Sequence, residues 1–255
     1  MKKKILLRVL STIILLASWE IIVRYFNIPE YTFPGPIVVM SKMYLMKAKL
    51  LEHLLVTLFE SLLGFFCGFV AAIIIAVAVI HSKWIEVLTE PSIIGMQSIP
   101  KIAIAPLIIM WFGLEMGPKI FLSALLSFFP IFISLVSGLR HVSSSLLDIM
   151  KIYKANKRQL LIWARIPNAL PELFLGITIA LPASIVGAIV GEWLGGEKGI
   201  GYLIINSQAN LDTPAVFAEL LVLGFMGIAF IRLARFIERK TVYWRKQEQG
   251  GSHPW

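Results

Sequence analysis

Three long stretches without Asp, Glu, Lys or Arg dominate this sequence, at residues 61–82, 120–139 and 173–191. Each is long enough to cross the roughly 30 Å hydrocarbon core of a bilayer as a helix. Of the whole chain, 58% is hydrophobic and only 15% is charged, whereas soluble domains carry about 25% charged residues. Too few polar residues are left to cover a soluble globule, and disorder is excluded for the same reason. The sequence therefore predicts an all-α polytopic membrane protein.

Three further apolar stretches are interrupted by charges or prolines, at residues 6–26, 91–112 and 214–233. The interrupting residues are Arg8, Glu20, Pro100, Lys101, Pro106 and Glu219. Together the stretches predict about six transmembrane helices in one transmembrane domain over residues 1–255. The amino terminus also resembles a secretory signal, but no small-residue cleavage site follows it, so we expect an uncleaved first helix. The tail at 250–255 has no structural signal and is interpreted as a possible expression tag or scar.

Lys and Arg predict the orientation. If the amino terminus is cytoplasmic, the inside segments hold 17 of the 24 Lys and Arg residues, the outside segments hold six, and Lys101 is the remaining one. Positive residues concentrate in cytoplasmic loops. We therefore expect both termini in the cytoplasm, and we attribute the net charge of +9 to this bias and not to nucleic-acid binding.

The sequence holds little that predicts catalysis. Cys67 is the single cysteine, so neither a disulfide framework nor a cysteine-rich metal site is available. The four histidines lack metal-ligand spacing, and the glycine-rich segment GGEKGIG lacks the spacing and the Lys-Ser/Thr end of a phosphate-binding loop. We expect no metal, no cofactor and no catalytic site on this chain. The glycines of GGEKGIG are interpreted as shaping a turn and re-entry after the fifth span.

Residues 140–168 are too polar to cross a membrane, yet their apolar residues recur at helical spacing. Ser143, Ser144 and Ser145 offer a helix start, and Asp148 falls in its early turns, where a carboxylate is favoured. A second helical piece is expected at 158–165, before Pro167 opens the next membrane helix. Two interpretations stay open at this point: a helix that docks to a soluble partner, or a basic helix that lies on anionic lipid.

This segment resembles the coupling segment of bacterial ATP-binding-cassette (ABC) importer permeases, E-A-A-x-x-x-G-x9-I-x-L-P. Aligned on Pro167, Asp148 takes the Glu position and Lys154 the Gly position, while Ala164 and Ile166 take the Ile and Leu positions. Ile149 and Met150 replace the two alanines. Lys154 replaces the glycine that turns the chain, so Asn156, which tolerates left-handed geometry, is predicted to take over that turn.

Longer stretches carry the same resemblance. Residues 98–140, with APLIIMWFGL, and residues 191–230, with GEWLGGEKGIGYLI, are similar to permeases of the nitrate/sulfonate/taurine/bicarbonate family. The resemblance covers roughly residues 29–237. That family also takes up pyrimidine and flavin precursors, and the Pro100–Lys101 pair leans toward this heterocycle-importing branch.

The resemblance implies a type I ABC importer permease in a bacterial inner membrane. Its partners would be a second permease copy, two cytoplasmic ATP-binding subunits that hold ATP and Mg²⁺, and an extracytoplasmic solute-binding protein. The substrate would be a sulfonate-type anion or a pyrimidine- or flavin-type heterocycle. The residues assigned to ATPase coupling are Asp148, Met150, Tyr153, Lys154, Ala155 and Asn156.

Polar residues within the apolar spans are candidates for the translocation pathway, because placing them in lipid is costly. The candidates are Gln97, Ser98, Lys101, Ser184 and Glu192. Three of them have a structural alternative. Lys101 is instead expected to pair with Glu60 or Glu219 or to reach the membrane surface, Glu192 to end its span as a solvated residue, and the small residues around Ser184 to allow close helix packing.

Two other function classes are open to a polytopic membrane protein. A secondary transporter or channel without an ATPase would favour inverted repeats or paired intramembrane carboxylates, and neither is evident in the sequence. An integral membrane enzyme would require a cluster of His, Asp or Ser near one interface. The sequence therefore favours the permease.

Overall fold

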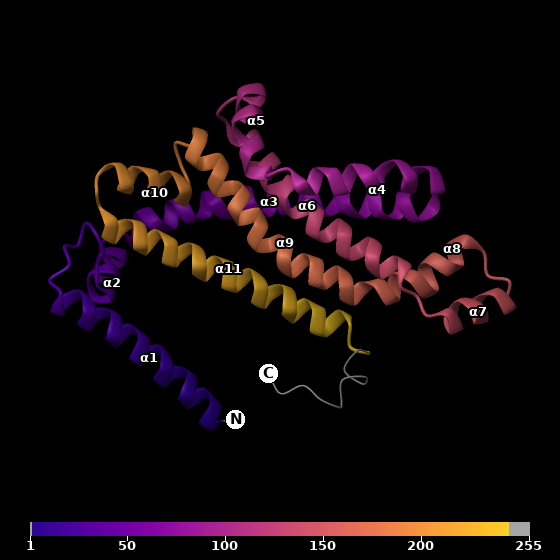
Figure 1. The fold of residues 1–255 in the computed structure, drawn as a ribbon, viewed down its shortest axis with the longest axis horizontal. Helices are drawn as coiled ribbons and strands as arrows, with labels where there is room; N and C mark the ends of the chain where they lie inside the picture. The colour runs from indigo at the N-terminus through magenta and orange to yellow at the C-terminus, as the bar shows by residue number, and fades with distance from the viewer. Residues whose placement is uncertain (1, 245–255) are drawn as a thin grey trace.

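The computed structural model describes residues 2–244, and within them the side chains of residues 2–5, 8, 9, 90–92, 94 and 96–98 lie outside the description. The described chain is helical, without a strand. Figure 1 shows an elongated bundle with α7 and α8 at one end and α2 and α10 at the other. The helices are α1 (Lys2–Tyr25), α2 (Pro36–Leu45), α3 (Lys47–His81), α4 (Lys83–Ser98), η1 (Lys101–Ile104), α5 (Ala105–Phe112), α6 (Met116–Arg140), α7 (Ser144–Ile152), α8 (Lys157–Leu160), η2 (Leu161–Arg165), α9 (Ile166–Gly195), α10 (Ile200–Ala209) and α11 (Thr213–Thr241).

Four helices of the described chain are long and apolar enough to cross a membrane: α3, α6, the continuous run Lys157–Gly195, and α11. They contain four of the six predicted spans, and α1 covers another as one helix. The remaining prediction, a single span over residues 91–112, is wrong in detail. The chain breaks there into the end of α4, η1 and α5, because Ile99 and Pro100 are extended, whereas Pro106 lies in the first turn of α5, where its missing donor costs nothing.

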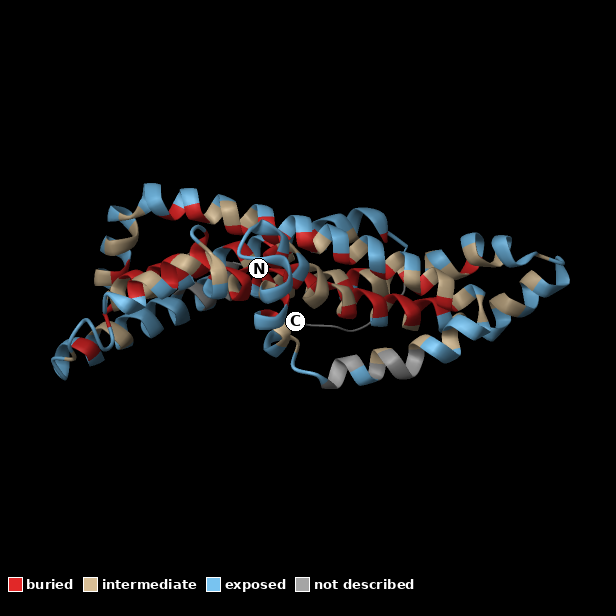
Figure 2. Ribbon diagram, turned by 90° about the horizontal axis from the view of Figure 1, so that it is seen from above, coloured by how far each residue is buried: buried red, intermediate tan, exposed pale blue. Residues whose placement is uncertain are grey.

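The centre of the bundle is the packing of α6 against α3 and α9. Small residues allow the close approach. A Cβ atom at Gly68 of α3 would lie 2.5 Å from the Ala124 carbonyl oxygen, and one at Gly187 of α9 would lie 2.6 Å from the Ser123 backbone. Figure 2 shows the buried residues concentrated along the middle of the bundle, giving way to exposed residues at the α7 and α8 end.

α10 and α11 complete the end opposite α7. α10 packs against α11, α9 and α3, while α11 runs along α9 and contacts α2. Asp212 begins α11 by accepting a hydrogen bond from the Ala215 amide, and its carboxylate lies 2.6 Å from the Lys42 ammonium of α2. Figure 1 shows that the start of α1 and the end of α11 both point away from the α2 and α10 end, toward the side that carries α7.

Candidate functional site: the coupling segment and the buried polar cluster

α7 is a short helix with an apolar surface that the rest of the chain does not cover. As predicted, Ser143 caps it, accepting a hydrogen bond from the Leu146 amide at 3.4 Å. No residue of α7 is buried, and Ile152 and Tyr153 are 78% and 81% exposed. Asp148 forms an exposed ion pair with Lys151 at 3.0 Å. An uncovered apolar helix face of this kind is suited to contact with another molecule.

The turn after α7 differs from the prediction. Lys154 itself adopts the left-handed conformation, with φ +49°, at the position where the resembling motif has glycine. Asn156 has φ −75° and instead caps α8, in a capping box in which its side chain and that of Gln159 each accept a hydrogen bond from the other's amide. Asn156 was predicted to make the turn because it tolerates left-handed geometry, but its capping role requires extended geometry. Ala155 lies between the two, half-buried.

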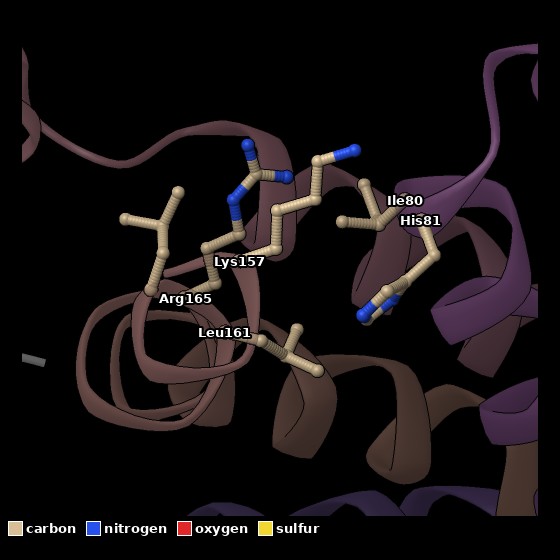
Figure 3. Close-up of a pocket in the computed structure, with 6 residues that line it drawn as sticks. Ile80, His81, Lys157, Leu161 and Arg165 are labelled. Carbon is tan, nitrogen blue, oxygen red and sulfur yellow. The ribbon is translucent and has the colours of Figure 1, made fainter. Parts of the chain in front are cut away.

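α8 continues through η2, one π-helical stretch, into α9, so the second helical piece and the next membrane helix form one rod. Figure 3 shows a pocket where this rod passes the end of α3, with Lys157 and Arg165 beside Ile80, His81 and Leu161. Its volume is about 200 Å³. Apolar side chains and the basic side chains of Lys157 and Arg165 line this pocket.

The structure separates the predicted pathway residues. Lys101 begins η1, and its ammonium lies 4.5 Å from the centre of the Phe129 ring, a cation–π contact. It therefore pairs with neither Glu60 nor Glu219. Gln97 and Ser98 close α4, and their side chains lie outside the described part of the chain.

Ser184 and Glu192 are both buried in the interior of the chain. The Ser184 hydroxyl donates to the Leu181 carbonyl, and its own carbonyl accepts from Ser123 of α6 at 2.8 Å. Glu192 is 1% exposed, so the alternative of a solvated helix end is wrong. Neither side chain lies on a surface of this chain that a solute could reach.

Glu192 belongs to a buried polar cluster that joins α3, α9 and the start of α10. Its Oε1 accepts a hydrogen bond from the Thr57 hydroxyl at 2.7 Å, and its Oε2 accepts one from the Gly201 amide at 2.6 Å. The Thr57 oxygen also accepts from the Ile200 amide at 2.8 Å. Nδ1 of His53 lies 3.0 Å from the Gly199 amide nitrogen and 3.1 Å from the Gly199 carbonyl oxygen, so it bonds to the backbone of Gly199. These bonds fasten the first turn of α10 to α3.

Three further charged residues are buried, on α3, α6 and α11. Glu60 of α3 is fully buried, and its Oε1 lies 3.4 Å from the ammonium of Lys119 of α6. Glu219 of α11 is also fully buried and accepts a hydrogen bond from Ser207 of α10 at 2.8 Å. Acidic groups on three membrane helices are thus turned into the bundle, where desolvation requires that they be paired or hydrogen-bonded.

Most of this cluster was not predictable residue by residue from the sequence. His53, Thr57 and Glu60 were not considered together, although their spacing of four and three residues places them on one helix face. Lys119 directly precedes the predicted span at 120–139, and nothing in the sequence indicated that its side chain is buried. Two sequence features could have indicated the cluster: the polar face of α3, and Glu192 followed closely by several glycines.

Gly199 explains why this connection is rich in glycine. Its φ is +109°, which side-chain-bearing residues rarely adopt, and a Cβ atom there would overlap the Glu192 carboxyl group. The interpretation of GGEKGIG as a turn-forming segment is therefore confirmed at Gly199.

Comparisons with known proteins agree on the family. The profile of the family described as "Binding-protein-dependent transport system inner membrane component" matches residues 64–243. A probable ABC transporter permease of Haemophilus influenzae is 36% identical, over 88% of this chain and 91% of the relative. The formylaminopyrimidine transport permease ThiX of Halalkalibacterium halodurans is 32% identical, over 92% and 94%. The riboflavin transport permease RibX of Chloroflexus aurantiacus is 34% identical, over 92% and 88%.

A solved structure supports the fold. The crystal structure of an amino acid ABC transporter with histidines superposes with a TM-score of 0.64 at 17% identity, covering 78% of this chain and 96% of that one. The all-α permease architecture predicted from the sequence is thereby confirmed. The chain belongs to the family of binding-protein-dependent transport system inner membrane components and is a permease component of an ABC transporter.

Proposed function

We propose that this chain forms the translocation pathway of an ATP-driven importer together with a second copy of itself. ATP and Mg²⁺ are held by two separate cytoplasmic subunits, and an extracytoplasmic binding protein delivers the solute. ATP then supplies the differential affinity that shifts a bistable permease pair between its inward-open and outward-open states. The family membership and the uncovered apolar face of α7 support this division of labour.

α7 is the proposed contact with the ATP-binding subunit. Ile149, Ile152 and Tyr153 are 49%, 78% and 81% exposed, and burying apolar surface in a groove of a partner contributes roughly 25 cal/mol per Å². The capped turn that Lys154 and Asn156 form behind α7 fixes how the helix is presented. The competing interpretation, a helix that lies on lipid headgroups, would use the same face without any partner.

We propose a small heterocycle of the pyrimidine or flavin type as the solute. The printed names of two relatives, ThiX and RibX, support this class, and sulfonate-type anions are the competing class. Because the binding protein presents the solute, its bound ligand identifies the class directly. Recovery of a sulfonate from that protein, with no heterocycle, would contradict the proposal.

The proposed orientation places both termini and α7 in the cytoplasm. Cysteine introduced at Ser144, which is exposed, should react with a membrane-impermeant maleimide only after the cells are opened, in a background where Cys67 is replaced by serine. Labelling of this position in intact cells would reverse the topology.

The decisive experiment is the double substitution Met150→Asp and Tyr153→Asp. The two positions are three residues apart and share one helix face, so the change places two charges in an apolar contact, at a cost of several kcal/mol unless they find partners. The ATP-binding subunit should no longer co-elute with the tagged permease, while the permease still inserts. The matched control is Ser144→Asp with Ser145→Asp, which adds the same charge at exposed polar positions. Equal recovery of the ATP-binding subunit from wild type and double mutant would remove α7 from the interface.

The same experiment addresses the secondary-transporter alternative. A transporter that needs no ATPase would bring down no ATP-binding subunit even as wild type, and its uptake would not depend on ATP. Uptake into vesicles that contain trapped ATP, compared with vesicles without it, separates the two classes.

A further inference from the structure

The pocket beside the end of α3 has no role in the proposed function. Its volume is about 200 Å³, and it is formed where two membrane-spanning helices reach the same end of the bundle (Figure 3). α3 contributes its last two residues, and the run Lys157–Gly195 contributes its first turns. The lining residues are Ile80, His81, Lys157, Leu160, Leu161 and Arg165. A pocket built from the ends of two spans lies at the depth of a membrane surface.

Two exposed tryptophans support this depth. Trp84 follows the last residue of α3 by three positions and is 82% exposed. Trp163 lies in η2, beside the pocket residues Leu161 and Arg165, and is 74% exposed. Tryptophan is enriched where a membrane meets water, because its ring is apolar while its N–H group hydrogen-bonds to polar partners. The pocket therefore opens at the level of the lipid headgroups.

The pocket carries two positive charges, and no carboxylate is among its described lining residues. Lys157 is exposed and Arg165 is half-buried. Within residues 2–244, neither cation has an ion-pair partner. Figure 3 shows both side chains extending to the same side of the pocket. Two adjacent cations without a neighbouring acid create a local potential that attracts an anion.

The π-helical stretch η2 explains how these two cations meet. Lys157 and Arg165 are eight residues apart, and eight residues of a regular α-helix exceed two full turns by about 80°. A π-helical turn is wider, because its hydrogen bonds span five residues instead of four, so η2 reduces this offset. Such turns within α-helices occur frequently at functional sites. η2 therefore brings two separated cations toward one face of the rod.

We propose that this pocket binds the phosphate group of an anionic phospholipid. Lys157 and Arg165 donate hydrogen bonds to the phosphate oxygens, and the planar guanidinium group suits bidentate contact. The apolar side chains of Ile80, Leu160 and Leu161 contact the glycerol and the first acyl carbons. Basic pockets between membrane helices bind anionic headgroups in this way.

The lining also selects among possible ligands. A zwitterionic headgroup is disfavoured, because the pocket offers its cationic group no carboxylate. Free inorganic phosphate would use the two cations but leave the apolar side chains without a contact. The inference depends neither on the direction of transport nor on the identity of the solute.

Lipid retention by the purified full chain tests the site. The chain is reconstituted in vesicles of phosphatidylglycerol and phosphatidylcholine in equal amounts, extracted in mild detergent and analysed by native mass spectrometry. Wild type should retain phosphatidylglycerol in preference to phosphatidylcholine. Lys157→Gln with Arg165→Gln should lower this retention by about tenfold or more, because charge-assisted hydrogen bonds are lost. Equal retention of both lipids by wild type, or unchanged retention by the double variant, would overturn the proposal.

The matched control is Arg235→Gln with Arg239→Gln. Both residues are exposed near the end of α11, which points toward the α7 side of the bundle (Figure 1), so the same charge is removed outside the pocket. This variant should retain phosphatidylglycerol as wild type does. An equal loss of lipid here would mean that net charge, and not the pocket, holds the lipid. Lys157→Arg with Arg165→Lys keeps both charges and should keep the lipid preference, which separates loss of charge from loss of folding.

Cysteine labelling locates the lipid within the pocket. Leu160→Cys, with Cys67 replaced by serine, places a thiol among the lining residues. Its reaction with a maleimide should be slower in phosphatidylglycerol vesicles than in phosphatidylcholine vesicles, and the difference should disappear once Lys157 and Arg165 are both replaced by glutamine. Equal protection by inorganic phosphate in phosphatidylcholine vesicles would identify free phosphate as the ligand and overturn the lipid assignment.

An acidic side chain of the ATP-binding subunit is the competing occupant. The double variant Lys157→Gln with Arg165→Gln should lose phosphatidylglycerol while the ATP-binding subunit still co-elutes with it. The opposite result, loss of that subunit with unchanged lipid retention, would assign the pocket to the ATPase contact and overturn the lipid site.

Discussion

The two ends of the bundle are built on opposite principles. At the α7 end, apolar residues such as Ile152 and Tyr153 are exposed and none of the helix is buried. At the α10 end, charged residues are buried: Glu60 lies beside the Lys119 ammonium, and Glu192 accepts hydrogen bonds from Thr57 and Gly201. The comparison teaches that the buried charges of one end have their partners within the chain, while α7 at the other end leaves an apolar face for another molecule to cover. Substitutions at the two ends should therefore have different effects. Those at the α10 end should affect the isolated chain, and those at the α7 end should affect only its assembly with a partner.

The largest expected effect is at the self-contained end, from Gly199→Val. The substitution imposes a strained φ near +109° and an overlap with the Glu192 carboxyl, which together cost about 3 kcal/mol or more. The monodisperse fraction in detergent after heating should fall sharply. Gly224→Val is the control, because a Cβ atom at Gly224 meets nothing within 4 Å. An equal fall of the monodisperse fraction in both variants would show that Gly199 is no more sensitive to a side chain than Gly224.

A second contrast compares two lysines. Lys119→Ala removes the ammonium that faces Glu60 and leaves buried carboxyls unbalanced, a loss of about 3–5 kcal/mol. Lys101→Ala removes only a contact with the Phe129 ring, worth about 0.5–2 kcal/mol. We expect Lys119→Ala to reduce the yield of folded chain and Lys101→Ala to leave assembly intact while lowering uptake. Failure of Lys101→Ala to assemble would assign Lys101 a structural role instead.

Smaller effects are expected at the end that needs a partner. Asn156→Ala removes the cap of α8 and half of its capping box, at a cost of about 1 kcal/mol. Because the turn is exposed, the chain should keep its thermal stability within a few degrees but recover less ATP-binding subunit on co-elution. Full recovery of that subunit would show that the capped turn does not control how α7 is presented.

The smallest effect is expected from Lys154→Gly, with the opposite sign. Lys154 adopts a left-handed conformation that glycine reaches without steric cost. Relief of that strain is partly offset by the greater freedom of glycine in the unfolded chain. Recovery of the ATP-binding subunit should equal or slightly exceed that of wild type. A clear loss would mean that the Lys154 side chain itself contacts the partner.

The same contrast explains what the sequence could predict. The spans within α3, α6, α9 and α11 were predictable because lipid excludes charge over about 20 residues, and the cap at Ser143 followed from local chemistry. The extension of α3 back to Lys47 was not, because Glu52, His53 and Glu60 interrupt its apolar run. His53 and Glu60 are buried against other helices and not in lipid, a distinction that depends on long-range packing.

The rod from Lys157 to Gly195 has a mechanical consequence. Its 39 residues extend about 58 Å at 1.5 Å per residue. One end follows the Asn156 cap behind α7, and Glu192 lies in its last turn. If this helix tilts by about 5° around one end, the other end is displaced by about 5 Å over that length. Motion imposed beside α7 would therefore be carried toward the α10 end along one continuous helix, with bending expected at the π-helical stretch Leu161–Arg165 and at the two internal prolines, Pro171 and Pro182.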